Sequence, residues 1–208
     1  MSKLLSLDLS TTCSGISIFS IKEESLLDFF TIKPPSPSKI SKGFKDLKYP
    51  EKQLVKMLEI SKELLKVVQK VNPDIIVIEE IAGSKQRLGQ KVLDGLHWIF
   101  LNKLLENKVD FNKIVYYDVT GKDGWRTHLG LKLSDSDKLQ NKEAKTLNKK
   151  LSTKNTKLSK ITPKTLACKF ANKKFGLQLN EVERSEEADL ADSICMGYSY
   201  LKNVREGK

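Results

Sequence analysis

Apolar and polar residues alternate along two short stretches near the N-terminus, at positions 3–8 and 16–21, and a third, largely apolar stretch follows at 26–32. A period of two residues is typical of β-strands that bury one face. A run of small residues at 10–15 and a charged run at 22–25 separate the stretches and predict turns. We therefore expect the chain to open as an antiparallel meander of three strands, with Asp8 near the end of the first strand.

The apolar period then lengthens to between three and four residues over positions 50–71 and 92–105, which is typical of helices. Proline at position 50 suits the first turn of such a helix. Between the two helices, the continuous apolar run at 75–78 predicts a strand that is buried on both faces. A fifth strand is expected at 113–119.

Two more helices are expected near the C-terminus. One begins at Thr162-Pro163, because a hydroxyl residue before proline is typical of a helix start, and it ends at Gly176. The last covers about 186–202, with Leu190, Ile194 and Leu201 on its apolar side. The whole order of elements predicts an α/β fold with a five-stranded mixed sheet flanked by helices on both faces.

We expect residues 1–208 to form a single domain, because this length suits one hydrophobic core. Positions 133–160 depart from the pattern, since they lack aromatic residues and are rich in Lys, Asn, Ser and Thr. Such a composition is typical of flexible segments. The segment is therefore predicted to be a flexible, Lys-rich insertion, and the alternative is a solvated linker that binds no partner.

The charge of the chain indicates the kind of partner. Its 208 residues include 37 Lys and Arg against 26 Asp and Glu, which gives a formal net charge of +11. Nucleic acid is the first candidate for a protein so basic, although such a charge also occurs in proteins that are merely rich in Lys. Only four of the basic residues are Arg, so we expect a non-specific Lys–phosphate grip rather than extensive base reading.

The cysteine and histidine residues indicate the cellular compartment and bear on whether the sequence contains a zinc site. Cys13, Cys168 and Cys195 lie in apolar contexts without a Cys-x-x-Cys pair, which predicts reduced, buried thiols in a cytoplasmic protein. His97 and His128 do not form a zinc-binding pattern. We expect no signal peptide and no membrane span, because the N-terminus leads directly into a strand and no apolar run is long enough.

Acidic residues stand at three places that this fold would bring together. Asp8 ends the first strand, Glu79 ends the fourth, and Asp189 and Asp192 share one face of the last helix. If the two strands are parallel neighbours and the helix packs across them, four carboxylates meet. The repulsion between these carboxylates would destabilise the fold. The same cluster of oxygen ligands is well suited to bind two Mg²⁺ or Mn²⁺ ions that assist phosphodiester hydrolysis. Taken alone, the pair on the helix is equally explained by the helix dipole.

Three motifs resemble those of the RuvC family of Holliday-junction resolvases, which are ribonuclease H-like nucleases. They are Leu7-Asp8-Leu9-Ser10-x-x-x-x-Gly15, Ile78-Glu79-Glu80 and Ala188-Asp189-Leu190-Ala191-Asp192-Ser193. The resemblance implies a Mg²⁺- or Mn²⁺-dependent endonuclease that works as a homodimer and nicks four-way junctions to leave ligatable ends. We expect 5′-phosphate and 3′-hydroxyl products. The tetrad of the family is matched by Asp8, Glu79, Asp189 and Asp192, and Glu79 matches better than Glu80.

The resemblance also implies basic residues beside the site. Arg126, in the loop after the fifth strand, and Lys164, at the start of the next helix, are the matches. Further DNA contacts are expected from basic residues in and after the polar segment 83–90 and on the following helices, namely Lys85, Arg87, Lys91 and Lys169. The helix at 92–105 is explained either as a buried central helix or as a dimer contact, and its match to the dimer helix of the family favours the homodimer.

Two departures from the family affect the expected substrates. Ala82 stands where the bacterial enzymes carry an aromatic residue that stacks on bases, and the insertion at 133–160 is longer than the family pattern. We therefore expect a range of branched DNA, including forks and flaps beside four-way junctions. The compact size and the insertion also suit a phage-encoded member.

Three other functions fit parts of the sequence. A nuclease for RNA–DNA hybrids would use the same carboxylates, and only the shape of its substrate separates it from a resolvase. An actin- or hexokinase-like ATPase is suggested by Asp8-x-Ser10-Thr11-Thr12, but the chain lacks a second phosphate loop. A non-catalytic binder of branched DNA is disfavoured, because a pure binder would gain by losing carboxylates that face phosphate.

Overall fold

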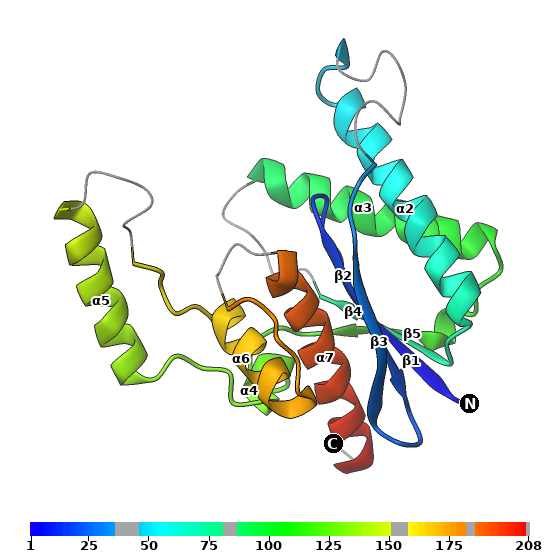
Figure 1. The fold of residues 1–208 in the computed structure, drawn as a ribbon. Helices are drawn as coiled ribbons and strands as arrows, with labels where there is room; N and C mark the ends of the chain where they lie inside the picture. The colour runs from blue at the N-terminus through cyan, green and yellow to red at the C-terminus, as the bar shows by residue number, and fades with distance from the viewer. Residues whose placement is uncertain (36–45, 81–86, 151–157, 182–185, 207–208) are drawn as a thin grey trace.

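The computed structural model describes residues 1–35, 46–80, 87–150, 158–181 and 186–206. Its sheet has five strands in the order β3-β2-β1-β4-β5 (Figure 1). They are β1 (Lys3–Asp8), β2 (Ser14–Ser20), β3 (Ser25–Ile32), β4 (Ile75–Glu79) and β5 (Ile114–Tyr117). The first three strands are antiparallel neighbours, whereas β1, β4 and β5 run parallel, so the predicted mixed sheet is confirmed.

The pairing of β1 with β4 fixes the place of two predicted site residues. Leu7 lies opposite Ile78 in the parallel register, so Asp8 and Glu79 follow at neighbouring positions on adjacent strands. Both strands end there, and the carboxyl ends of parallel strands are where functional sites of α/β sheets gather.

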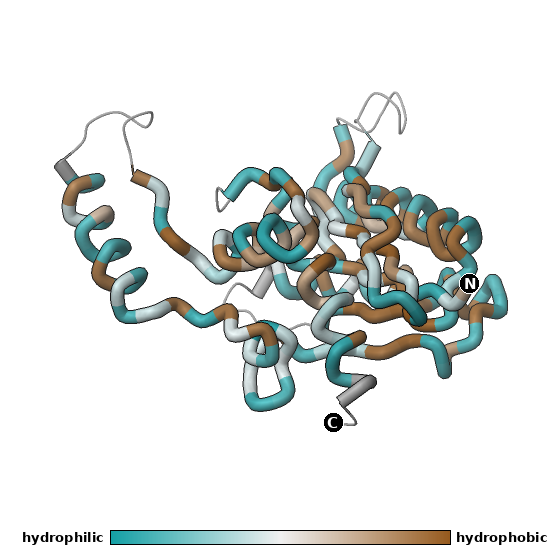
Figure 2. Tube along the Cα trace, turned by 60° about the horizontal axis from the view of Figure 1, so that its bottom comes forward, coloured by the Kyte–Doolittle hydropathy of each residue, from teal (hydrophilic) through white to brown (hydrophobic). Residues whose placement is uncertain are grey.

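Helices cover both faces of the sheet, as predicted. Alternate residues of β1 point to opposite faces, so Leu5 and Leu7 pack toward one layer and Leu4 toward the other. The first layer contains α2 (Glu51–Val71) and α3 (Arg87–Glu106). The second contains α4 (Trp125–His128), α6 (Pro163–Phe175) and α7 (Glu186–Glu206). Figure 2 shows the hydrophobic segments gathered between these layers.

Polar side chains fasten α7 to the middle of the sheet. The hydroxyls of Ser6 on β1 and Ser17 on β2 both donate to the backbone carbonyl oxygen of Ser193, at 2.8 and 2.9 Å. All three residues are fully buried. Because Ser193 directly follows Asp192, these hydrogen bonds fix the position of a predicted site residue relative to the two central strands.

The structure differs from the sequence-based expectation at the Lys-rich segment. Residues 135–150, which we predicted to belong to a flexible insertion, form the helix α5 (Asp135–Lys150). The helix stands apart from the body of the protein in Figure 1. Whether α5 moves relative to the sheet stays a prediction, and residues 151–157 lie outside the described part of the chain.

The three cysteines are free and buried, in agreement with the sequence. Within the described residues, no helix combines the length and the apolar character that crossing a bilayer requires.

Candidate active site

The four predicted acidic residues line one pocket of about 480 Å³ at the carboxyl ends of β1 and β4. Asp8 and Glu79 come from the two strands, and Asp189 and Asp192 come from the first two turns of α7. Three segments that are 71 or more positions apart in the chain therefore meet at one pocket, as expected if β1 and β4 are parallel neighbours and the last helix packs across them.

Burial and mutual repulsion raise the pKa values of two of the four carboxyl groups. Burial raises the pKa of Asp8 well above its usual value, and the carboxylates of Glu79 and Asp192 raise it further. Burial also raises the pKa of Asp192 to about 7, although the Arg126 charge opposes the shift. The side chain of Asp192 is 1% exposed, and its Oδ1 atom has no hydrogen-bond partner in the described part of the protein.

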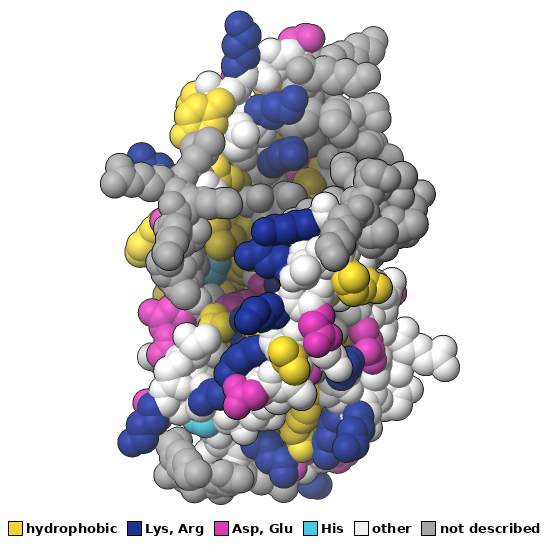
Figure 3. Space-filling view, turned by 90° about the vertical axis from the view of Figure 1, so that its left-hand side faces the viewer, with side chains coloured by type: hydrophobic (Ala, Val, Ile, Leu, Met, Phe, Trp, Pro, Cys, Tyr) yellow, Lys and Arg dark blue, Asp and Glu magenta, His cyan; other side chains and the backbone are white. Residues whose placement is uncertain are grey.

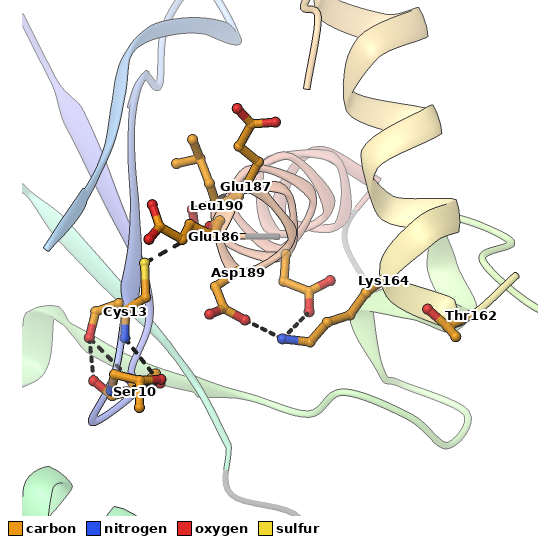
Figure 4. Close-up of polar contacts among 12 residues, drawn as sticks. Ser10, Cys13, Thr162, Lys164, Glu186, Glu187, Asp189 and Leu190 are labelled. Atoms are coloured by element: carbon orange, nitrogen blue, oxygen red, sulfur yellow. Dashed lines mark hydrogen bonds and ion pairs between the residues drawn. The ribbon is translucent and has the colours of Figure 1, made fainter. Parts of the chain in front are cut away.

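Two cations lie against the carboxylates. Arg126 donates from one guanidinium nitrogen to Asp192 Oδ2 at 2.7 Å. Lys164 reaches from the start of α6 to Asp189 on α7, and its ammonium lies 3.9 Å from Asp192 Oδ2 (Figure 4). Burial would lower the pKa of Lys164, but the charges of Asp8 and Asp192 and the contact with Asp189 raise it above the usual value. The two residues that matched the basic positions of the family are thus part of the site.

The start of α6 explains why Lys164 is so placed. Thr162 caps the helix by accepting a hydrogen bond from the backbone N–H of Thr165, and Pro163 occupies the first turn. Lys164 therefore leaves the helix at a fixed first-turn position and points at α7. The pair with Asp189 is partly exposed, with 37% of the Lys164 side chain and 19% of the Asp189 side chain accessible.

The donor set fits a hard divalent cation. Mg²⁺ and Mn²⁺ prefer carboxylate oxygens, and the buried Oδ1 of Asp192 has no hydrogen-bond partner among the described residues. Among the described residues, no three Asp, Glu, His or Cys side chains already stand in metal-binding geometry. The four carboxylates nevertheless line one shared pocket.

The other predicted DNA contacts lie outside the pocket or outside the described chain. Lys91 on α3 and Lys169 on α6 are exposed and do not line the pocket. Lys85 lies outside the described residues, and Arg87 is the first residue of α3, with a side chain that is not described. For these four residues DNA contact stays a prediction.

Sequence reasoning did not place several polar residues that line the same pocket. Ser10 and Thr11 lie at its rim on the loop after β1, and His97 and Gln90 reach it from α3. His97 is 5% exposed, and burial lowers its pKa to about 4, so it is neutral at pH 7. A polar His within an apolar helix was the available signal, but its orientation depends on how α3 packs.

Replacing Arg126 by Met is expected to destabilise the metal-free protein by about 2 kcal/mol at pH 8. The change leaves a buried carboxylate without its hydrogen-bonded partner, while Lys164 remains nearby and limits the loss. The loss should shrink toward pH 5, because the raised pKa of Asp192 lets this carboxyl take up a proton instead. Chemical denaturation at both pH values measures the effect.

The double change of Arg126→Met with Asp192→Asn is the control, since it removes both charges. It should recover part of the lost stability at pH 8. An Arg126→Met variant as stable as the wild type at pH 8 would show that the ion pair contributes nothing to the fold.

Comparison with known proteins supports the architecture. No protein-family model matches the chain, and no curated protein matches it in sequence. Among solved structures, Thermus thermophilus RuvC in complex with a Holliday junction substrate is 15% identical, with a TM-score of 0.54 over 100% of this chain and 97% of that chain. The yeast mitochondrial Holliday junction resolvase Ydc2 is also 15% identical, with a TM-score of 0.51 over 97% of this chain and 78% of that chain. At this identity the likeness shows the fold, which is the RuvC-like, ribonuclease H-like fold that the motifs predicted.

Proposed function

We propose that this chain, which has the RuvC-like fold, is a divalent-metal-dependent endonuclease that nicks four-way DNA junctions and other branched DNA. The observation that carries the proposal is the convergence of Asp8, Glu79, Asp189 and Asp192 with Arg126 and Lys164 in one pocket. Carboxylates that are held close together despite burial and mutual repulsion are typical of sites that bind Mg²⁺ for phosphoryl chemistry. The net charge of +11 suits a polyanionic substrate.

Each part of the pocket has a role in phosphodiester hydrolysis. Asp8 and Asp192 would hold the metal most directly, together with Glu79 and Asp189. When bound, the ions lower the pKa of water and stabilise the leaving oxygen. Lys164 and Arg126 then hold the scissile phosphate by its outer oxygens, in exchange for their present contacts with Asp189 and Asp192. Water adds to the phosphorus and the P–O3′ bond breaks, which leaves 5′-phosphate and 3′-hydroxyl ends.

A homodimer through α3 is part of the proposal. Trp98 and Leu105 on this helix are 72% and 63% exposed, and Leu101 lies between them on the same face. The opposite face is buried in the body of the protein through Leu96, Phe100 and Leu104. Exposed apolar side chains on one face of a helix favour a contact with another protein chain, and a two-fold dimer would present two sites to a symmetric junction.

A cleavage assay on labelled DNA of matched sequence tests the function. It compares a four-way junction, a fork, a linear duplex and an RNA–DNA hybrid, each with Mg²⁺, Mn²⁺ or EDTA. We expect paired nicks in the junction and cuts in the fork, both abolished by EDTA, and religation of the nicked strands by DNA ligase. The linear duplex should remain largely intact.

Other outcomes assign the pocket to another function. Cleavage of the hybrid alone would retain the metal site but make the chain a hybrid nuclease. Junction binding without cleavage under any metal would replace the proposal by a structural DNA-binding role.

A further inference from the structure

Two described segments lie side by side, the helix α5 and residues 158–161, and together they form what we call the arm. It consists of α5, which leads away from the body, and the described return segment 158–161, which leads back to α6 (Figure 1). Ser134 caps the outgoing helix, since its hydroxyl accepts a hydrogen bond from the backbone N–H of Asp137 at 3.1 Å and donates to the Asp137 carboxylate at 2.6 Å. The base of the arm is therefore an ordered helix start.

Two asparagines hold the return segment against α5. Asn141 donates to the carbonyl oxygen of Ile161 at 2.6 Å and accepts from its N–H at 2.8 Å. Asn148 makes the same pair of hydrogen bonds with Leu158, at 2.9 and 2.8 Å. Each asparagine thus donates to and accepts from the backbone of an extended segment, as a neighbouring β-strand would. The extended segment 158–161 runs antiparallel to α5.

The spacing of these contacts matches the geometry of both segments. The asparagines are seven positions apart on the helix, which is about 10 Å of rise, and their partners are three positions apart on an extended segment, which is also about 10 Å. Ala144 lies between the asparagines and is 5% exposed, so a small side chain lets the segments approach. The position of 158–161 along α5 is therefore fixed by specific side-chain hydrogen bonds.

A row of lysines follows another side of α5. Lys138, Lys142, Lys145 and Lys149 recur at intervals of four, three and four residues and are all exposed. At 100° per residue they fall within a narrow stripe, roughly a quarter turn from the asparagine face. Among the described residues, the only ion pair in this stripe joins Lys138 to Asp135, and both of those side chains are mostly exposed. Such a surface pair adds little stability and is readily exchanged for another anion.

The stripe continues toward the acidic pocket. Lys138, at the base of the arm, lines a hollow of about 640 Å³ together with Lys122, Lys132 and Arg126. Arg126 also lines the acidic pocket, so it joins the two cavities. Figure 3 shows this side of the molecule, where Lys and Arg side chains follow one another beside a hollow. Basic side chains therefore lie beside the candidate active site, around the neighbouring hollow and along α5.

We propose that the arm binds the phosphate backbone of a duplex that flanks the cleaved strand. The inference rests on the proposed function for the identity of DNA as the ligand. The lysine stripe from Lys138 to Lys149 is about 16 Å long, and one strand of B-form DNA carries a phosphate for each 3.4 Å of axis, so the stripe spans roughly five phosphates. Lys side chains provide charge without base recognition, so the arm reads the presence of a duplex rather than its sequence.

The test removes three lysines of the stripe and compares an equal loss of charge elsewhere. The variant is Lys142→Ala, Lys145→Ala and Lys149→Ala. The matched control is Lys62→Ala, Lys66→Ala and Lys70→Ala, three exposed lysines on α2, which covers the opposite face of the sheet. All six lie on helix surfaces where alanine is well tolerated, and thermal melting checks that both variants fold.

Binding is measured in EDTA, so that cleavage does not interfere, over a range of salt concentrations. The probe is a four-way junction with long duplex arms. For the long-armed junction, the arm variant should bind at least about 10-fold more weakly at low salt. The slope of log K against log salt should become shallower by about 2 to 3, close to 0.9 for each lost phosphate contact.

The control variant should keep the wild-type slope. A wild-type slope in the arm variant overturns the inference, and so does an equal change in the arm and control variants. If the wild type nicks junctions but the arm variant shows that wild-type slope, the arm inference fails and the proposed function stands. If the wild type binds with an arm-dependent slope but cuts nothing, the proposed function fails and the arm inference stands.

Discussion

Replacing Asp8 by Asn is expected to lower junction nicking by about 1,000-fold or more, because a bound metal ion supplies several kcal/mol of transition-state stabilisation. The same change should raise the free energy of unfolding of the metal-free protein at pH 8. The raised pKa of Asp8 means that its charged form is less favourable in the folded protein than in the unfolded chain. Asn keeps the shape of the side chain and removes the buried charge.

The stability gain has a defined pH dependence. As the pH falls toward the raised pKa of Asp8, the wild-type carboxyl takes up a proton in the folded state, and the advantage of the variant disappears. Denaturation in EDTA at several pH values measures this, and melting with added Mg²⁺ measures metal binding separately. The ion should raise the melting temperature of the wild type more than that of Asp8→Asn.

Asp28→Asn is the matched control, because Asp28 is exposed on β3 and distant from the pocket-lining residues. It should nick junctions at the wild-type rate. If Asp8→Asn instead keeps its nicking activity, or loses stability at pH 8, Asp8 is a structural residue and the proposed metal site is wrong.

Replacing Gly15 by Ala is expected to destabilise the protein by about 3 kcal/mol and to lower nicking by about 100-fold. A Cβ at this position would lie 2.1 Å from the backbone carbonyl oxygen of Asp189, closer than any real contact. Gly15 belongs to the strand β2 and the Asp189 carbonyl to the backbone of α7, so neither can turn aside as a flexible side chain would, and α7 has to move. The free-energy cost of such overpacking lies at the upper end of its usual range. Gly15 also pairs with Asp8 across β1 and β2, so the displacement occurs inside the site. Misplacement of catalytic groups by about 1 Å is costly for the rate.

Chemical denaturation and single-turnover nicking measure the two effects. The matched control is Gly95→Ala on α3, where the new Cβ would lie 3.1 Å from the flexible end of Met57. Alanine is a better helix former than glycine, so this variant should be as stable as the wild type or slightly more stable. A Gly15→Ala variant that melts and nicks like the wild type would show that the close approach of α7 to β2 is not needed for the site.

The strands and helices could be predicted because the spacing of apolar residues that identifies each one lies within a few neighbouring positions of the sequence. The alternation in β1 and β2 and the continuous apolar run of β4 depend on residues within a few positions of one another. The four carboxylates could be brought together from these patterns because parallel strands place their ends at one edge of the sheet. Gly15 belonged to the recognised motif, but the reason for a glycine there became clear only from the distance to Asp189.

The arm was not predictable from its own residues. Positions 135–150 have few apolar residues and a composition typical of flexible segments, so their sequence favoured a mobile insertion. The helix is held instead by Asn141 and Asn148, whose partners lie 20 and 10 positions further along the chain. Side-chain amides carry no periodic signal, and only the folded path of 158–161 gives them their acceptors and donors.

The chain by itself thus determined the strands, most helices and the identity of the acidic residues, because hydrophobic period and residue type are written in neighbouring positions. The tertiary structure decided which cation meets which carboxylate: Arg126 lies 66 positions from Asp192, and Lys164 lies 25 from Asp189. Such pairings depend on how α4, α6 and α7 pack against one another. That packing is set by the summed burial of many side chains, and so no single stretch of sequence encodes it.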